Sequence, residues 1–271
     1  MPPSPEPVDP PAATVGALAA LARDPGTAAL VLDFDGVLVP IVDDPAGSRL
    51  DDAVRADLAR LAGRLGLVAV VSGRRLGFLV DQVRIDGVRL LGSYGLEERV
   101  DGRNTVLGHV GPWLAALDDA RAELSARLAD VAGVRIEVKS VSVAAHWRQA
   151  ADRATARPSV ERAVAAVAER TGLVAKPAKL ALELLPPVGV DKGSTVRRLL
   201  EESEARAAVF VGDDLGDVPA LDAVRESGGH AVVVLHGEET PTELLRHATE
   251  TVDGSHGMRQ WLRCVAQVIA S

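Results

Sequence analysis

The chain has 271 residues, of which 47% are hydrophobic and 25% are charged, a composition typical of a globular protein long enough for one large domain or two modest ones. Its formal net charge of -8 argues against a nucleic-acid-binding surface, because such surfaces are usually basic. The single cysteine, Cys264, excludes an intrachain disulfide, and no apolar run reaches the roughly 18 residues of a membrane helix. We therefore expect a cytoplasmic protein.

The first half of the chain alternates between short apolar runs and segments with helical spacing. Residues 1–12 are rich in proline and acid and lack the basic start and apolar stretch of a secretory signal, so we expect a disordered tail. The apolar runs predict buried parallel strands, and the spacing of Val54, Leu58 and Leu61 predicts a helix. The predicted elements are helix 13–24, strand 28–32, helix 51–65, strand 67–71, helix 76–83 and strand 88–91. This order is the βαβ repeat of a parallel sheet.

The pattern changes after Gly111-Pro112 and returns near Lys192. The intervening segment predicts helix 113–131, strands 134–138 and 141–147, helix 159–171, and strands 173–176 and 180–184. Its order αββαββ, with short hairpin-like joins, indicates an antiparallel sheet covered by helices on one face. The last part predicts helix 192–202, strand 207–211, helix 218–225, strand 230–235 and a helix near 257–269.

The predicted fold is therefore α/β, with a Rossmann-like parallel-sheet core that is interrupted by an inserted α+β cap. The core is expected to comprise residues 13–110 and 188–271, and the cap residues 111–187. Pro186-Pro187-Val188-Gly189 is the expected return linker, and the cap is expected above the ends of the strands.

Two carboxylates, Asp33 and Asp35, follow the first buried strand. Ligands bind at the carboxyl ends of parallel strands, and residues i and i+2 of an extended segment point to the same side. Asp33 and Asp35 could thus face one phosphate, one attacking and the other moving a proton, while Gly36 lets backbone amides approach closely. The alternative is a turn in which the aspartates only satisfy the backbone.

A second cluster of acids, Asp213, Asp214 and Asp217, follows the apolar run that ends at Val211. Three like charges within five residues repel one another unless a cation holds them, and carboxylates are ligands that Mg²⁺ prefers. The alternative is a solvated acidic turn that caps the next helix.

Two further motifs suit an anion. Ser72-Gly73-Arg74 follows another buried strand and offers a hydroxyl donor and a flexible turn to a phosphate oxygen. Asp191 can act as the N-cap of a helix whose first turn holds Lys192, which is then free to reach an anion. Either motif alone is common in loops and helix starts.

Together, these four motifs resemble the haloacid dehalogenase-like hydrolase superfamily, in which they occur in this order. The resemblance implies that Asp33 is the nucleophile that forms an aspartyl-phosphate and that Asp35 is the general acid and base. It also implies that Ser72 and Lys192 bind the transferring phosphoryl group. The implied Mg²⁺ ligands are Asp33, the Asp35 carbonyl and Asp213, with help from Asp214 or Asp217. Val37 departs from the threonine that many members carry.

The inserted segment carries the candidate sugar-binding residues. Lys139, His146, Arg148 and Glu183 supply the hydrogen-bonding groups that sugar hydroxyls require, with Trp147 as a packing surface. The alternative for each residue is the solvated side of a half-buried hairpin.

Longer strings make the chain similar to the trehalose-6-phosphate phosphatase family. They include the segment around Asp33, Val-Ser-Gly-Arg, Gly-Ser-Tyr-Gly-Leu-Glu, the Glu-x-Lys to His-x-Arg hairpin, and Leu-Glu before proline. The resemblance implies that Lys139, His146, Arg148 and Glu183 bind the disaccharide of trehalose 6-phosphate. The departures are Tyr94 for the usual histidine, Val138 for aspartate, Trp147 for tyrosine, and residues 215–218 for a Thr-x-Glu-Asp-type continuation.

The expected function is Mg²⁺-dependent hydrolysis of trehalose 6-phosphate in trehalose biosynthesis. Two alternatives stay open: another sugar-phosphate phosphatase or phosphomutase of the superfamily, and a catalytically silent sugar-sensing paralogue, which the presence of both Asp33 and Asp35 disfavours. The expected partner is a small sugar phosphate, with neither nucleic acid nor membrane. A monomer is expected.

Overall fold

The computed structural model describes residues 15–42, 47–178 and 180–270, so the tail predicted for residues 1–12 lies outside the described residues. The chain divides into two compact units. One combines the residues up to Thr105 with those from Val190 onward, and the other is Val106–Gly189. The second unit thus starts a few residues before the segment predicted as the cap and ends shortly after it.

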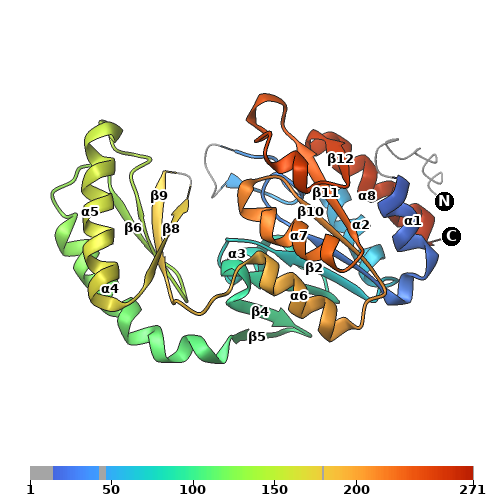
Figure 1. The fold of residues 1–271 in the computed structure, drawn as a ribbon, viewed down its shortest axis with the longest axis horizontal. Helices are drawn as coiled ribbons and strands as arrows, with labels where there is room; N and C mark the ends of the chain where they lie inside the picture. Colours follow the sequence, from blue (N-terminus) through green and yellow to red (C-terminus); the bar gives the residue numbers. More distant parts are fainter. Residues whose placement is uncertain (1–14, 43–46, 179, 271) are drawn as a thin grey trace. The chain divides into compact units, whose positions relative to one another are not determined.

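The first unit is built on an eight-stranded sheet with the order β12-β11-β10-β1-β2-β3-β4-β5 (Figure 1). The pairs from β12 to β3 are parallel, and β4 is antiparallel to β3. Its strands are β1 Ala28–Leu32, β2 Leu67–Val71, β3 Val88–Gly92, β4 Glu97–Val100, β5 Arg103–Val106, β10 Ala207–Gly212, β11 His230–Leu235 and β12 Glu250–Asp253. The parallel sheet predicted from the apolar runs is confirmed.

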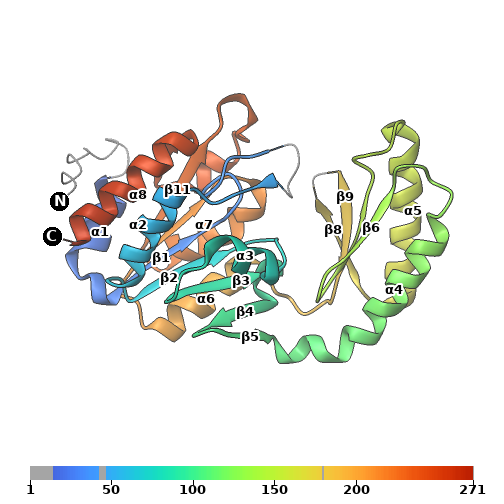
Figure 2. The ribbon, with the colours of Figure 1, turned by 180° about the vertical axis from the view of Figure 1, so that it is seen from behind.

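Helices cover both faces of this sheet (Figures 1 and 2). Leu30 and Leu32 of β1 are buried in one core with Trp261, whereas Ala29 and Val31 are buried in the other. The first core is formed with α1 Val15–Arg23, α2 Asp52–Ala62, α3 Leu76–Val83 and α8 Gly254–Ala270. The second is formed with α6 Lys192–Ser203 and α7 Val218–Glu226. Successive side chains of a strand alternate between faces, so β1 is buried on both sides.

The second unit has a four-stranded antiparallel sheet with the order β6-β7-β9-β8. Its elements are α4 Leu114–Arg127, β6 Arg135–Val138, β7 Val143–His146, α5 Arg153–Thr171, β8 Val174–Ala178 and β9 Ala181–Leu185. Both helices lie on one face of the sheet, as Figure 2 shows, and Leu124 and Val160 share a core with Val143, Ala145 and Leu184. The αββαββ order expected for this segment is confirmed.

Several boundaries differ from the sequence expectation. The short strands β4, β5 and β12 were not predicted, and α5 begins at Arg153 although Pro158 lies in its second turn. The helix predicted over residues 113–131 is shorter: Trp113 ends the 3-10 segment Gly108–Trp113, and α4 begins at Leu114. The remaining 3-10 segments are Pro25–Thr27, Ser93–Gly95, Leu215–Asp217, Gly237–Glu239 and Leu244–His247. Among the helices of the described residues, none has the length and apolarity to cross a lipid bilayer.

Candidate active site

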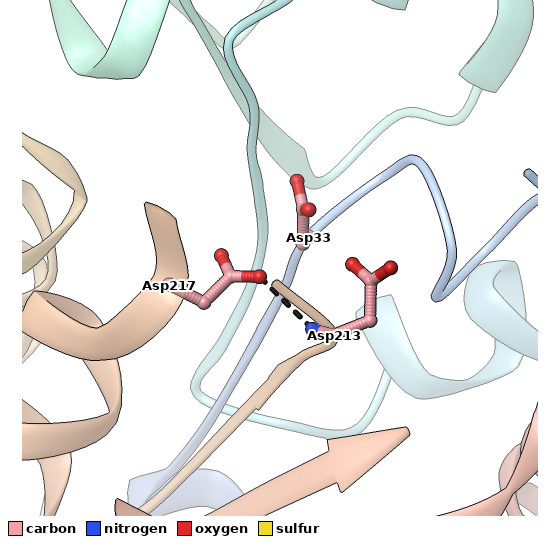
Figure 3. A group of neighbouring side chains, drawn as sticks. All are labelled: Asp33, Asp213 and Asp217. Carbon is pink, nitrogen blue, oxygen red and sulfur yellow. Dashed lines mark hydrogen bonds between the residues drawn. The ribbon is translucent and has the colours of Figure 1, made fainter. Parts of the chain in front are cut away.

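The two acidic motifs meet at the centre of the parallel sheet. β1 and β10 are neighbours, and the Asp33 amide donates to the Val211 carbonyl at 2.9 Å. The carboxyl ends of both strands lie at one edge, where ligands of α/β sheets bind. One oxygen each from Asp33, Asp213 and Asp217 lies within 4.8 Å of the others, and all three residues are buried (Figure 3). The structure therefore brings Asp33 next to two acids that lie 180 or more positions further along the sequence.

Asp217 organises the loop that carries Asp213. Its Oδ2 accepts hydrogen bonds from the Asp213 amide at 2.9 Å, drawn in Figure 3, and from the Asp214 amide at 3.2 Å. Its Oδ1 accepts from Lys192 Nζ at 2.6 Å. Both oxygens of Asp217 are thus engaged by protein donors. The Asp214 carboxylate lies outside the cluster, because its Oδ1 accepts from the Gly216 amide at 2.7 Å.

Lys192 lies between the acids because α6 begins at this residue. Asp191 caps the helix: its carboxylate accepts from the Ser194 amide at 2.7 Å, and Ser194 Oγ accepts from the Asp191 amide at 2.9 Å. The Lys192 side chain is only 5% exposed, and its Nζ lies 3.0 Å from Asp33 Oδ1. The ammonium therefore bridges Asp33 and Asp217.

Burial and charge shift the pKa values of these groups. Burial raises the pKa of Asp33 well above its usual range, Lys192 lowers it, and Asp217 and Asp213 raise it further. Burial raises the pKa of Asp213 to about 6, while a hydrogen bond from His236 lowers it. For Lys192, burial opposes the charge, but Asp217 and Asp33 outweigh burial and raise the pKa well above its ordinary value. A cluster of buried carboxylate oxygens facing one ammonium is a donor set that fits a hard divalent cation.

Gly36 is required by the position of Asp213. Its φ of +78° lies in the left-handed region, and a Cβ at this position would lie 1.9 Å from Asp213 Oδ2. Any side chain at residue 36 would thus displace the Asp213 carboxylate. His236 lies on the loop after β11, and its Nε2 is 3.1 Å from the Gly36 carbonyl oxygen.

Asp35 and Arg74 form a bidentate ion pair. Arg74 Nε donates to Asp35 Oδ2 at 2.7 Å, and Arg74 Nη2 donates to Asp35 Oδ1 at 2.6 Å. Arg74 Nη2 also lies 3.2 Å from Ser48 Oγ, and the guanidinium stacks 4.6 Å from the centre of the Phe78 ring. The Asp35 carboxylate is thus outside the cluster of Asp33, Asp213 and Asp217. Arg74 was predicted to bind the substrate, but its guanidinium contacts Asp35, the expected acid and base.

Ser72 and Gly73 lie at the end of β2, next to β1. Ser72 is buried, and its Oγ accepts from the Arg74 amide at 3.2 Å. Its carbonyl accepts from the Tyr94 amide at 2.9 Å, and a Cβ at Gly73 would lie 3.0 Å from the Tyr94 ring. Thr195 Oγ1 donates to the Tyr94 carbonyl at 2.9 Å. Tyr94 therefore supports the expected phosphate loop.

The expected sugar-binding residues lie in the second unit. Val143, Ala145 and Leu184 are buried in its core, so the alternation of β7 and β9 places His146 and Glu183 on the opposite face. Lys139 Nζ donates to Glu183 Oε1 at 2.7 Å, and Ser142 Oγ donates to the same oxygen. His146 Nε2 lies 2.9 Å from Glu137 Oε2.

Arg148 follows β7 and is partly buried, and its carbonyl accepts from Arg153 Nε at 3.1 Å. The structure thus gathers Lys139, His146 and Glu183 on one side of the sheet, and places Arg148 just past the end of β7.

Sequence reasoning missed His236, Ser48 and Ser142, each of which contacts an expected site residue. His236 had a usable signal, because it directly follows an apolar strand and so falls at the edge where Asp33 and Asp213 lie. Ser48 and Ser142 had none, because serine is frequent in loops.

Comparison with known proteins finds similar sequences and similar folds. A family model described as trehalose-phosphatase matches residues 31–251. The trehalose-phosphate phosphatase of Mycobacterium ulcerans (strain Agy99) is 34% identical over 236 residues, which cover 82% of this chain and 59% of that protein. That of Mycobacterium avium (strain 104) is 35% identical over 223 residues, 78% of this chain and 55% of that protein. This chain thus spans less than two thirds of these relatives.

A solved structure shares the fold of both units. The crystal structure of a trehalose-6-phosphate phosphatase related protein aligns with a TM-score of 0.75 and 25% identity, covering 88% of this chain and 97% of that one. The C-terminal domain of the Candida albicans trehalose-6-phosphate phosphatase has the same TM-score of 0.75 at 19% identity, covering 97% of this chain and 99% of that one. From its sequence match and its architecture, the chain belongs to the trehalose-phosphatase family.

Proposed function

We propose that the chain is a Mg²⁺-dependent phosphoric monoester hydrolase that converts trehalose 6-phosphate to trehalose and phosphate. The observation that carries the proposal is the buried Asp33 carboxylate, whose Oδ1 lies 3.0 Å from Lys192 Nζ within a cluster of acids at the carboxyl edge of a parallel sheet. A carboxylate needs a nearby cation to attack a phosphate, because the two are both anions.

In the proposed reaction, Asp33 attacks phosphorus and the bond from phosphorus to the sugar oxygen breaks. Asp35 gives its proton to the departing sugar oxygen, which leaves an aspartyl-phosphate on Asp33. Asp35 then takes a proton from water as the water oxygen bonds to phosphorus, and the bond to Asp33 breaks to restore the carboxylate. Arg74 fixes the position of the Asp35 carboxylate through its two hydrogen bonds.

Asp33 and Asp213, with the Asp35 carbonyl, would hold Mg²⁺, which offsets charge on the phosphoryl oxygens. Asp217 and Asp214 are the two acids expected to help hold the metal. Asp217 already accepts hydrogen bonds from Lys192 and from two backbone amides, and Asp214 accepts one from the Gly216 amide. Asp217 therefore supports the site by orienting Lys192 and the Asp213 loop. Ser72 and Lys192 bind the phosphoryl group, and Gly36 and Gly73 allow backbone amides to approach it.

The sugar is proposed to bind through Lys139, His146, Arg148 and Glu183. Glu183 is buried, with only 2% of its surface exposed, and the donors Lys139 and Ser142 share one of its oxygens. A carboxylate fixed in this way can accept hydrogen bonds from sugar hydroxyls in a defined direction.

Phosphate release from a panel of sugar phosphates, with Mg²⁺ and with EDTA, tests the proposal. We expect activity that is strongest with trehalose 6-phosphate and absent with EDTA, and we expect Asp33→Asn to reduce it to background. Activity that survives EDTA or Asp33→Asn would reject the proposed chemistry. A preference for another sugar phosphate would reject only the substrate.

The role of Glu183 is tested by a comparison of two substrates. Glu183→Ala should reduce kcat/KM for trehalose 6-phosphate far more than for p-nitrophenyl phosphate, which lacks the sugar. Glu161→Ala, at an exposed residue of α5 paired with Arg157, is the matched control and should affect neither substrate. Equal losses on both substrates would contradict a place for Glu183 in sugar binding.

A further inference from the structure

His236 contacts two different loops at the acidic cluster. Its Nε2 lies 3.1 Å from the Gly36 carbonyl oxygen and 3.5 Å from Asp213 Oδ2. Gly36 belongs to the loop after β1, Asp213 to the loop after β10, and His236 to the loop after β11. These three strands are adjacent in the sheet order β11-β10-β1. One imidazole therefore joins the loop of the nucleophile to the loop of an expected metal ligand.

His236 is itself held in place. Its side chain is only 15% exposed, and its backbone amide donates to Thr240 Oγ1 at 2.6 Å. Carbonyl and carboxylate oxygens are both acceptors, so Nε2 must carry a hydrogen in order to donate to either of them. This contact serves both partners with one donor.

Asp213 needs such a donor. Its carboxylate is 7% exposed and faces the like charges of Asp33 and Asp217. Within residues 15–42, 47–178 and 180–270, His236 is the one side-chain donor in contact with it. Lys192, the buried cation of the cluster, pairs with Asp33 and Asp217 and not with Asp213. Without His236, repulsion from Asp33 and Asp217 would favour rotation of Asp213 away from the cluster.

The close packing at Gly36 makes this rotation consequential. The Asp213 carboxylate lies where a Cβ of residue 36 would be, so a small movement of either loop changes their separation. Groups that orient a metal ligand from outside set metal affinity, and their loss typically weakens binding about 10- to 100-fold.

We infer that His236 is a positioning residue for the metal site, holding the Asp213 carboxylate and the Gly36 carbonyl in the arrangement that binds the divalent cation. The inference rests on the proposed function, since it assumes that Asp213 is a metal ligand. It adds a residue from a third loop, one that neither attacks phosphate nor touches the metal.

Mg²⁺ binding to the full chain without substrate, measured by isothermal titration calorimetry, tests the inference. His236→Ala should weaken Mg²⁺ binding about 10- to 100-fold. His236→Gln keeps an amide donor of similar reach and should recover most of the affinity. The Mg²⁺ concentration that gives half-maximal phosphate release should rise in parallel. Thermal unfolding of the metal-free variants separates a loss of folding from a loss of metal.

His247→Ala is the matched control. His247 forms a similar pair with Asp222, at 2.7 Å between Nδ1 and Oδ1, and contacts none of the expected site residues. The His247→Ala variant should bind Mg²⁺ with the affinity of the wild type. The inference is overturned if His236→Ala binds Mg²⁺ as tightly as wild type, or if His236→Gln is as weak as His236→Ala.

The outcomes distinguish this inference from the proposed function. Mg²⁺ that binds wild type and depends on His236, without hydrolysis of any sugar phosphate, would reject the proposed function and support the inference. Hydrolysis of trehalose 6-phosphate with equal Mg²⁺ affinities in wild type and His236→Ala would support the proposed function and reject the inference. Absence of Mg²⁺ binding to wild type would overturn both.

Discussion

Lys192 is the residue on which the charge balance of the candidate site depends. Its ammonium is almost fully buried and lies 3.0 Å from Asp33 and 2.6 Å from Asp217. Burial alone would favour the neutral amine, yet the two carboxylates raise the pKa of Lys192 well above its ordinary value. The ammonium therefore stays charged, and it compensates for two buried acids at once.

Removal of this cation should destabilise the fold and abolish the proposed reaction. We expect Lys192→Met to lower the free energy of unfolding by about 3–5 kcal/mol, because a buried carboxylate loses its partner, and to abolish phosphate release. Urea denaturation and a phosphate assay measure the two effects. Arg197→Ala removes an exposed ion pair with Glu226 and should cost no more than about 1 kcal/mol. Equal destabilisation by both changes would contradict the role given to Lys192.

For single residues, the sequence predicts the place in the fold better than it predicts the contacts of the side chain. Asp33, Ser72 and Asp213 could be placed at one edge because each follows an apolar strand, and the carboxyl ends of parallel strands share an edge. The partners of each side chain were not predictable, since they depend on rotamers and on loops that meet only in the fold. Arg74 was expected to bind the substrate but forms an ion pair with Asp35, and the contact between His236 and Gly36 was not predicted.

Helix α2 carries a buried carboxylate with a pH-dependent cost. Asp57 lies 2.6 Å from Arg60 and 3.9 Å from Arg263 of α8. Burial raises the pKa of Asp57 above its ordinary value of 3.8, although Arg60 and Arg263 lower it. The folded state thus keeps this proton to a higher pH than the unfolded state. The associated stability is fully present below the unfolded pKa and is lost as pH rises through the folded pKa.

Asp57→Asn should remove that loss, because an amide has no such proton. We expect the variant to gain stability relative to wild type at neutral pH and to match it near about pH 3, where both states are protonated. Urea denaturation as a function of pH measures the difference. Asp52→Asn, at an exposed residue of the same helix, should show no such gain. A variant that is less stable at neutral pH would indicate that the arginine contacts outweigh burial.

The elements that were missed share a physical cause. β4 and β5 have few buried residues, so they lack the apolar runs that predicted the parallel strands. Their turn was nevertheless visible: Asp101-Gly102 adopts positive φ at both residues, the conformation that favours Asp-Gly in two-residue hairpins. Helix α5 extends before Pro158 because the Asp152 carboxylate caps it, accepting from the Thr155 amide at 3.1 Å. Capping thus outweighed the one hydrogen bond that proline removes.

The whole molecule consists of two units, and the chain of the first is interrupted by the second. β1 has β2 and β10 as neighbours, and β10 follows the Val106–Gly189 unit in sequence. The αββαββ order of that unit was predictable from its hairpin-like joins. Its start was predicted at residue 111, where the sequence pattern changes, whereas the unit begins at Val106, ahead of the 3-10 segment Gly108–Trp113.

A chain truncated after Gly189 should retain only the second unit. It lacks β10 and β11, so β1 becomes an open parallel edge without the helices α6 and α7 that cover one face. We expect limited proteolysis of this chain to leave a resistant fragment near residues 106–189, whereas the full chain resists in both units. A resistant fragment that contains β1, β2 and β3 would contradict the expectation.

The interruption also determines the order in which the residues of the candidate site are synthesised. Asp33 leaves the ribosome long before its partners Lys192 and Asp213, which follow the inserted unit in the sequence. At about 5–20 residues per second, synthesis of the intervening segment takes roughly 10–30 seconds. During that interval Asp33 has neither the cation nor the acids that surround it in the folded chain. The inserted unit has time to fold first, and the candidate site is assembled only when β10 joins the sheet.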